Sequence, residues 1–248
     1  VPSEISNDQT ENYKNIFNNK IEIKNLNYGY VNTKIKTLRN INLTIKKGQS
    51  IGVFGPSGSG KSTLISLILG LLTPTSGSIK IDNVELSSQL TAWQRSIGYV
   101  PQSVYLTDDT IAQNIAFGIS KNRIDNKMLD RAIEASQLKE FVFSLEDGIE
   151  TIVGENGVRL SGGQMQRIGI ARALYNNPSV LVFDEATSSL DYDTEKELMI
   201  DIDKLKKEKT LIIITHRLST VENCDFIIKI KSGEISKQGA PEEIIQKK

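Results

Sequence analysis

Residues 55–62 read Gly-Pro-Ser-Gly-Ser-Gly-Lys-Ser, and this run constrains the fold more than any other part of the chain. It follows a short apolar segment at residues 50–54 and precedes an apolar run at residues 61–72. The first segment predicts a strand, and the second predicts a buried helix. A glycine-rich loop of pattern G-x-x-x-x-G-K-[ST] between a strand and a helix predicts a backbone that curls around phosphate groups.

The residue types in this loop suit a bound triphosphate. Glycines let successive N–H groups point at phosphate oxygens, and the start of the following helix adds partial positive charge. Lys61 is expected to reach the β- and γ-phosphates, and the Ser62 hydroxyl to bind Mg²⁺. The flanking strand and helix disfavour the alternative, a surface loop with a chance lysine. The predicted nucleotide contacts are Gly55, Pro56, Ser57, Gly58, Ser59, Gly60, Lys61, Ser62 and Thr63.

The rest of the chain alternates strand-like apolar runs with helical patterns. Two uninterrupted runs, Val180–Phe183 and Leu211–Ile214, fit strands buried on both faces of a parallel sheet, with a helical stripe at residues 198–205 between them. Residues 103–172 are mostly helical in pattern. Further strands are predicted at residues 21–26, 41–45, 226–230 and 234–237. This alternation implies an α/β fold with helices on the faces of the sheet.

Composition narrows the classes of function. The 30 basic and 30 acidic residues cancel, which argues against broad binding to nucleic acid, because such binding needs a basic face. The one cysteine, Cys224, allows no internal disulfide and fits a reducing compartment.

The longest apolar run, residues 64–72, is far shorter than the about 20 residues that cross a bilayer, so a membrane role requires a partner or a further segment. Residues 1–20 are polar and rich in Asn, and we expect a tail or linker there.

Two adjacent acids, Asp184 and Glu185, follow the first of the buried runs. The carboxyl end of a strand is where open α/β sheets bind ligands. We expect Asp184 to hold Mg²⁺ and Glu185 to polarise the attacking water as general base. Adjacent residues of a strand point to opposite faces, so the chain must turn here for both acids to face a nucleotide. The phosphate loop upstream disfavours the alternative of two solvated acids.

A further motif makes the order of these elements specific. Leu160-Ser161-Gly162-Gly163-Gln164 ends 20 residues before Asp184 and is followed by Gln166-Arg167 and Ala171-Arg172-Ala173. With the phosphate loop before it and the acids after it, the chain resembles the ATPase domains of ABC transporters over about residues 21–246. The resemblance implies an ABC-ATPase fold of the P-loop NTPase type at residues 21–248. Such a fold has a mostly parallel core sheet, an antiparallel β subdomain and an inserted helical subdomain, here at about residues 103–172.

The resemblance assigns roles to residues outside the phosphate loop. Gln102 resembles the Q-loop glutamine, which contacts Mg²⁺ and water and touches the membrane subunit. His216, the one histidine, resembles the switch histidine that hydrogen-bonds the γ-phosphate and orients the water. Asp191 resembles the D-loop acid. Tyr30 resembles the aromatic that stacks on adenine, with Tyr28 as a competing candidate.

These assignments give two overlapping sets of residues. The catalytic set is Lys61, Gln102, Glu185 and His216. The Mg²⁺ ligands are Ser62, Gln102 and Asp184. Glu185 and His216 are both present, which disfavours a binding module without turnover. Stacking on one ring face discriminates little between bases, so the choice between adenine and guanine stays open.

One chain leaves one side of the γ-phosphate uncovered. In the family, the motif that corresponds to residues 160–164, called the signature, covers that side from a second subunit. Ser161 and the N–H groups of Gly162 and Gly163, with Gln164, lie at a predicted helix start and suit that task. The resemblance therefore implies a head-to-tail dimer around two ATP molecules with Mg²⁺. It also implies a fused or associated transmembrane domain at the cytoplasmic side of a membrane, and no nucleic acid. Homodimer and heterodimer both stay open.

Two segments resemble exporters in particular. Residues 151–157, with Glu155 as their acid, resemble the segment that contacts membrane-domain coupling helices, and residues 109–118 also look exporter-like. The implied function is the motor domain of an exporter or flippase, and the alternative is a free-standing ATPase subunit of an importer. Soluble ABC ATPases for DNA repair carry long insertions that this chain lacks. Lipids, lipid-linked sugars, peptides and drugs remain possible cargo, and residues 99–118 resemble flippases for lipid-linked oligosaccharides.

Replacing Lys61 by alanine tests the phosphate-loop assignment. The change removes charge-assisted hydrogen bonds to phosphate, so affinity for ATP should fall at least about tenfold. Titration with a fluorescent ATP analogue measures the affinity. An unchanged dissociation constant contradicts the assignment.

Overall fold

The computed structural model describes residues 16–31, 36–188, 190–206 and 208–245. Residues 1–15 of the expected tail and Ser189, beside the expected D-loop acid, lie outside the described residues. Within the described part, no helix combines the length and the apolar character needed to cross a membrane.

A six-stranded sheet with strand order β10-β9-β3-β8-β7-β6 forms the core. Five of its strands run parallel, and β10 pairs antiparallel with β9 at one edge. This arrangement confirms the mostly parallel core sheet. The strands are β3 (Ser50–Phe54), β6 (Ile97–Val100), β7 (Val180–Asp184), β8 (Thr210–Thr215), β9 (Phe226–Lys231) and β10 (Glu234–Gly239).

Side chains of the core strands alternate between two apolar clusters. In β7, Val180 and Val182 belong to the cluster on one face, and Leu181 and Phe183 belong to the cluster on the other. All four side chains are at most 1% exposed. The uninterrupted apolar runs of the sequence are therefore strands buried on both faces, as predicted.

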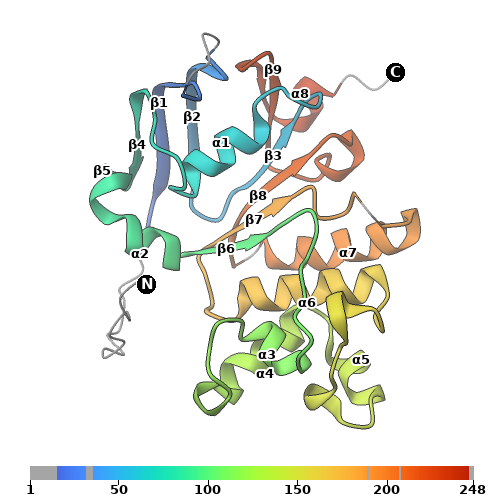
Figure 1. The fold of residues 1–248 in the computed structure, drawn as a ribbon. Helices are drawn as coiled ribbons and strands as arrows, with labels where there is room; N and C mark the ends of the chain where they lie inside the picture. The colour runs from blue at the N-terminus through green and yellow to red at the C-terminus, as the bar shows by residue number, and fades with distance from the viewer. Residues whose placement is uncertain (1–15, 32–35, 189, 207, 246–248) are drawn as a thin grey trace.

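One face of the core sheet is covered by α1 (Lys61–Ile68) and by a second sheet (Figure 1). This second sheet is antiparallel, with strand order β2-β1-β4-β5, and it confirms the antiparallel β region. Its strands are β1 (Lys20–Tyr28), β2 (Leu38–Lys46), β4 (Ser76–Ile81) and β5 (Val84–Glu85). Apolar residues of α1 and of both sheets share one cluster.

Helix α1 ends earlier than the apolar run predicts. Gly70 adopts a left-handed φ of 70°, its N–H donates to the Leu67 carbonyl, and the Leu71 N–H donates to the Ser66 carbonyl at 2.8 Å. This pair of bonds is the Schellman motif, which closes a helix at a glycine. The apolar side chains of residues 69–72 therefore follow the helix rather than extend it.

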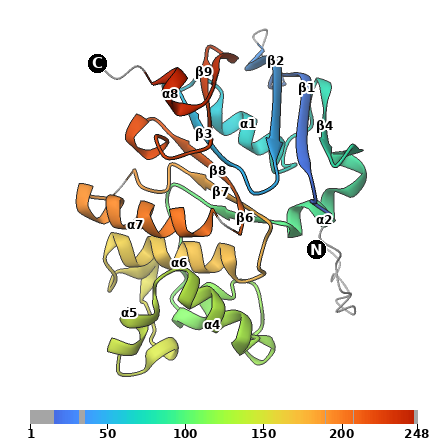
Figure 2. The ribbon, with the colours of Figure 1, turned by 180° about the vertical axis from the view of Figure 1, so that it is seen from behind.

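Helices cover the other face of the core sheet. Figures 1 and 2 show α6 and α7 along this face, with α3, α4 and α5 beyond α6. These helices are α3 (Ile111–Ile115), α4 (Asn126–Ala135), α5 (Lys139–Ser144), α6 (Gly162–Leu174) and α7 (Tyr192–Leu205). The remaining helices are α2 (Leu90–Arg95) and α8 (Pro241–Ile244). The 3₁₀ turns are η1 (Leu86–Gln89), η2 (Lys121–Arg123), η3 (Gly148–Glu150), η4 (Glu155–Gly157) and η5 (Leu218–Thr220).

The apolar core also extends into residues that precede the first predicted strand. The ring of Phe17 is fully buried and meets the ring of Trp93 edge to face, with 5.9 Å between ring centroids. Trp93 lies in α2, and its Nε1–H donates to the Ile68 carbonyl of α1 at 2.7 Å. The carboxylate of Asp82 accepts hydrogen bonds from the backbone N–H groups of residues 18–20. Phe17 thus anchors the end of the polar leader on the α1 side of the fold.

Replacing Phe17 by alanine should lower the free energy of unfolding by about 3 kcal/mol, because it removes a buried ring and leaves a cavity. Chemical denaturation followed by circular dichroism measures the change. Phe143, which is 77% exposed in α5, supplies the matched control, and Phe143→Ala should change stability by less than about 0.5 kcal/mol. Equal effects at the two positions contradict the anchoring.

Candidate nucleotide-binding and catalytic site

Four parallel strands end at the same edge of the core sheet, and each is followed by a predicted site residue. The loop after β3 leads to Lys61, β8 is followed by His216, β7 ends at Asp184, and β6 is followed closely by Gln102. Because β3, β8, β7 and β6 are consecutive in the sheet, these segments are neighbours in space. Ligands of open α/β sheets bind at this edge.

The carboxylate of Glu185 lies between two of these residues. Its Oε1 is 3.9 Å from Lys61 Nζ, and its Oε2 is 3.6 Å from His216 Nδ1. Lys61 is 6% exposed and also donates to the carbonyls of Gly55 and Pro56, at 3.0 and 3.1 Å. The His216 side chain is half exposed. The structure therefore brings together a cation, an acid and an imidazole that lie far apart in the sequence.

A backbone turn at Glu185 lets this carboxylate face the phosphate loop. Glu185 adopts a left-handed φ of 50°, which is uncommon for a residue with a side chain. Its N–H donates to the Ile214 carbonyl of β8, and its carbonyl accepts from the Ser188 N–H, both at 2.9 Å. The chain thus turns directly after Asp184, as the two adjacent acids predicted, and the bond to β8 holds the turn.

The phosphate loop contains a buried polar atom that no described residue satisfies. Ser59 is 4% exposed, and its hydroxyl oxygen has no hydrogen-bond partner within the described part of the chain. Buried polar groups are normally hydrogen-bonded, so such an atom fits a loop that completes its bonds with a ligand. Together with the ammonium of Lys61, the loop fits an anionic group.

Asp184 is held by Tyr99 of β6, which donates its hydroxyl to Oδ2 at 3.0 Å. Burial of the carboxyl group raises the pKa of Asp184, and the Tyr99 hydrogen bond offsets part of that effect. Burial and the neighbouring acid raise the pKa of Tyr99 to about 12. Gln102 is exposed, and its Nε2 donates to Ser188 Oγ at 3.3 Å.

The predicted Mg²⁺ ligands fit a hard cation by their chemistry. Ser62, Gln102 and Asp184 offer a hydroxyl, an amide oxygen and a carboxylate, which are the oxygen donors that Mg²⁺ prefers. Their joint coordination of Mg²⁺ stays a prediction.

The predicted adenine-stacking residue lies beside the phosphate loop. Tyr30 is 47% exposed, and its hydroxyl lies 3.3 Å from the hydroxyl of Thr63 in α1. Tyr28, the competing candidate, is half-buried and meets the Tyr30 ring edge to face at 5.1 Å. The larger exposure of Tyr30 favours it as the ring that a base can reach.

Residues 161–164 form the first turn of α6, on the opposite side of the core sheet from α1 (Figure 1). Ser161 and Gln164 make a capping box: Ser161 Oγ accepts from the Gln164 N–H at 3.2 Å, and Gln164 Oε1 accepts from the Ser161 N–H at 2.8 Å. A Cβ on Gly163 would lie 2.8 Å from the Thr194 methyl of α7. Close packing within the chain is therefore a second reason for glycine here.

Asp191 caps the helix that packs beside this turn. Its carboxylate accepts from the backbone N–H and the hydroxyl of Thr194, at 3.0 and 2.7 Å, and these bonds lower the pKa of Asp191. The turn at residues 161–164 and the Asp191 cap thus lie side by side, with Ser161 and Asp191 both exposed.

Comparison with known proteins identifies the family. Residues 38–188 match the family model described as ABC transporter. The chain belongs to the ABC transporter family. It is 40% identical over 226 residues to the ATP-dependent lipid A-core flippase of Pasteurella multocida (strain Pm70). It is 46% identical over 232 residues to the alpha-hemolysin translocation ATP-binding protein HlyB of Escherichia coli O157:H7. These matches cover 91% and 92% of the chain.

A solved structure described as a bacterial Atm1-family ABC exporter with ATP bound superposes with a TM-score of 0.81 at 34% identity, over 91% of this chain. The ABC-ATPase fold is thereby confirmed. The chain spans 39% of the flippase, 32% of the translocation protein and 39% of the exporter chain. It is therefore an ABC transporter ATP-binding domain, and such domains bind ATP.

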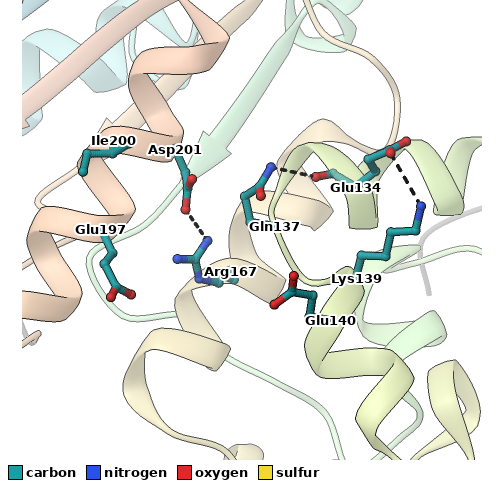
Figure 3. Close-up of a pocket in the computed structure, with 8 residues that line it drawn as sticks. All are labelled: Glu134, Gln137, Lys139, Glu140, Arg167, Glu197, Ile200 and Asp201. Atoms are coloured by element: carbon teal, nitrogen blue, oxygen red, sulfur yellow. Dashed lines mark hydrogen bonds and ion pairs between the residues drawn. The ribbon is translucent and has the colours of Figure 1, made fainter.

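The ABC domain also contains a groove of about 490 Å³ that none of the predicted site residues lines. Figure 3 shows its walls, formed by α4, α5, α6 and α7. Arg167 of α6 joins two of these walls: it pairs with Asp201 of α7 at 2.6 Å and donates to the Ser136 carbonyl at 3.3 Å. Glu197 and Ile200 also line the groove. Lys61, Glu185 and His216 do not line this groove. Within it, the Arg167–Asp201 ion pair joins α6 to α7.

Three residues of the ABC site were not predicted. Tyr99 holds Asp184, buried Gln166 of α6 donates to the Ala186 carbonyl beside Glu185, and Glu195 of α7 is buried near the same turn. For Glu195 a signal existed in the sequence, because it precedes Leu198 by three residues and so shares the apolar face of the helix. No comparable pattern marked Tyr99 or Gln166.

Replacing Asp184 by asparagine tests the electrostatics of the ABC site without nucleotide. The raised pKa means that the native state holds this proton more tightly than the unfolded chain does. Ionisation of Asp184 therefore destabilises the native state as pH rises above the ordinary carboxyl pKa of about 3.9. Asp184→Asn should raise the melting midpoint at about pH 7 and lose this advantage toward about pH 4. Asp130→Asn, an exposed acid of α4, is the control, and a lower midpoint for Asp184→Asn contradicts the assignment.

Proposed function

We propose that this chain is the ATP-hydrolysing motor domain of an exporter- or flippase-type ABC transporter. The observation that carries the proposal is the Glu185 carboxylate, 3.9 Å from Lys61 Nζ and 3.6 Å from His216 Nδ1, at the ligand-binding edge of the sheet. Phosphoryl transfer depends on positioning and charge neutralisation, and these three groups supply both.

Each group has one task in the proposed reaction. Lys61 neutralises charge on the β- and γ-phosphates. Glu185 accepts a proton from a water molecule whose oxygen attacks the γ-phosphorus, while the bond to the bridging oxygen breaks and ADP leaves. His216 holds the γ-phosphate and the water in line. Ser62, Gln102 and Asp184 would hold Mg²⁺, which when bound would neutralise further charge on the phosphate oxygens.

The dimer is part of the proposal. Ser161 is exposed at the start of α6, and its turn lies across the core sheet from the chain's own phosphate loop. A partner in head-to-tail orientation supplies this turn to the open side of the nucleotide, so that each of two ATP molecules is held by Lys61 of one chain and Ser161 of the other. Hydrolysis then weakens the dimer.

Coupling to a transmembrane domain rests on the relatives and on one surface. The relatives named above are a flippase, a translocation protein and an exporter, which favours export over the importer alternative. The two exporter-like segments also pair with each other: Thr110 forms a β-bridge with Ile152, and the Ile111 N–H donates to the Thr151 carbonyl at 3.0 Å. Ile152 is 51% exposed on this joint surface. We propose that this surface meets the membrane domain at the cytoplasmic side.

Replacing Glu185 by glutamine tests the proposed reaction. Loss of the general base should lower kcat for ATP hydrolysis at least about 100-fold, while affinity for ATP stays within about twofold. The variant should also accumulate an ATP-bound dimer on a sizing column. Phosphate release and analytical gel filtration are the measurements.

The controls separate the parts of the proposal. Glu222→Gln, an exposed acid in the segment between β8 and β9, should leave turnover unchanged. If Glu185→Gln hydrolyses ATP as fast as the unchanged chain does, Glu185 is not the general base. If a monomeric Ser161→Ala variant shows full turnover, the proposed dimer with shared nucleotides is contradicted, while the proposed ATP hydrolysis stands.

A further inference from the structure

A buried carboxylate outside the proposed catalytic set joins the two segments that carry Glu185 and His216. Glu195, in α7, is 8% exposed. Its Oε1 accepts hydrogen bonds from the hydroxyls of Thr187 at 2.8 Å and Thr220 at 3.3 Å. Its Oε2 pairs with Nη1 of Arg217. Both carboxylate oxygens are thus engaged.

The partners of this carboxylate sit next to the proposed catalytic groups in sequence. Thr187 is two residues after Glu185, and Arg217 directly follows His216. Thr187 and Thr220 are both buried. Glu195 therefore contacts the chain just after β7 and just after β8. At these points the backbone has left the strands and is no longer held by their regular hydrogen bonds.

These segments depend on side-chain contacts for their position, because neither Glu185 nor His216 lies in a strand or helix. Glu185 has a left-handed φ of 50°, and such strained residues persist only where surrounding contacts over-determine them. Gln166 of α6 fixes the Ala186 carbonyl from one side, and Glu195 fixes Thr187 from the other. Misplacement by about 1 Å can lower a rate about 100-fold, so these contacts bear directly on turnover.

We propose that Glu195 is a positioning residue for ATP hydrolysis: it clamps Thr187 and Arg217 so that Glu185 and His216 keep their mutual geometry. The inference rests on the proposed function. Stability alone does not call for a carboxylate at position 195. An apolar residue of similar size could fill the same buried space, and a buried ion pair often contributes no more stability than such a residue does. A carboxylate here instead fixes the position of three polar partners.

The test compares two variants of α7 in the 248-residue chain. Glu195→Gln keeps the side-chain volume and an acceptor for Thr187, but it leaves the Arg217 cation without its charge partner. We expect kcat for ATP hydrolysis to fall at least about tenfold, with KM and the dissociation constant of a fluorescent ATP analogue within about twofold. Glu197→Gln is the matched control, because Glu197 lies on the same helix, exposed in the groove of Figure 3. It should retain full kcat.

A second pair of variants keeps the inference testable if Glu195→Gln fails to fold. Thr187→Val removes the hydroxyl that donates to Glu195, and Thr187→Ser retains it. Thr187→Val should lower kcat at least about fivefold, and Thr187→Ser should restore it to within about twofold, with circular dichroism confirming that both are folded.

A merely structural role gives a different pattern. A lower melting midpoint for Glu195→Gln with unchanged kcat per folded molecule overturns the inference, as does equal turnover of Thr187→Val and Thr187→Ser. Either result leaves the proposed function intact if the unchanged chain hydrolyses ATP. A chain that binds ATP without hydrolysing it overturns the proposed function, and this inference with it.

Discussion

The parallel pairing of β3, β8, β7 and β6 is the constraint on which the site depends. Parallel strands end together, so four segments that are distant in sequence meet at one edge of the sheet. The bond from the Glu185 N–H to the Ile214 carbonyl continues the contact between β7 and β8 one residue past the end of β7. This bond turns the carboxylate toward Lys61 and His216, and the chemistry of the chain follows from that placement.

Buried polar groups then fix the details of this edge. Lys61, Gln166 and Glu195 are each at most 8% exposed, and each reaches a backbone carbonyl or a side chain of a neighbouring segment. Burying a charged or amide group is unfavourable unless it is hydrogen-bonded, so few arrangements of these segments are possible. The site is thereby held by polar contacts at the end of a sheet whose interior is held by apolar ones. Asp184 illustrates the consequence, because burial of its carboxyl group raises its pKa and so disfavours its charged form.

The chain's own surface explains why a second copy enters the proposal. The capping box of Ser161 and Gln164 presents the first turn of α6 outward, beside the Asp191 cap of α7. Gln166, two residues after Gln164 in α6, donates to the Ala186 carbonyl in the turn that carries Glu185. The helix whose first turn we propose covers a partner's nucleotide thus also contacts the turn that carries the chain's own Glu185.

The sequence by itself determined the local elements and most of the proposed site. Uninterrupted apolar runs predicted β7 and β8, and the glycine-lysine loop predicted the strand, turn and helix around Lys61, because these signals depend on neighbouring residues alone. It did not predict β4, β5 or β6, since β4 begins with polar residues and glycine, β5 has two residues, and β6 has four residues with a glycine among them. Periodicity placed Glu195 on the apolar face of α7, but it did not show which partners a carboxylate there would have. Only the tertiary structure decided that Tyr99 meets Asp184 and that Glu195 joins Thr187 to Arg217. Those contacts bring together residues from different strands and helices, and their geometry depends on how the whole sheet and its covering helices pack.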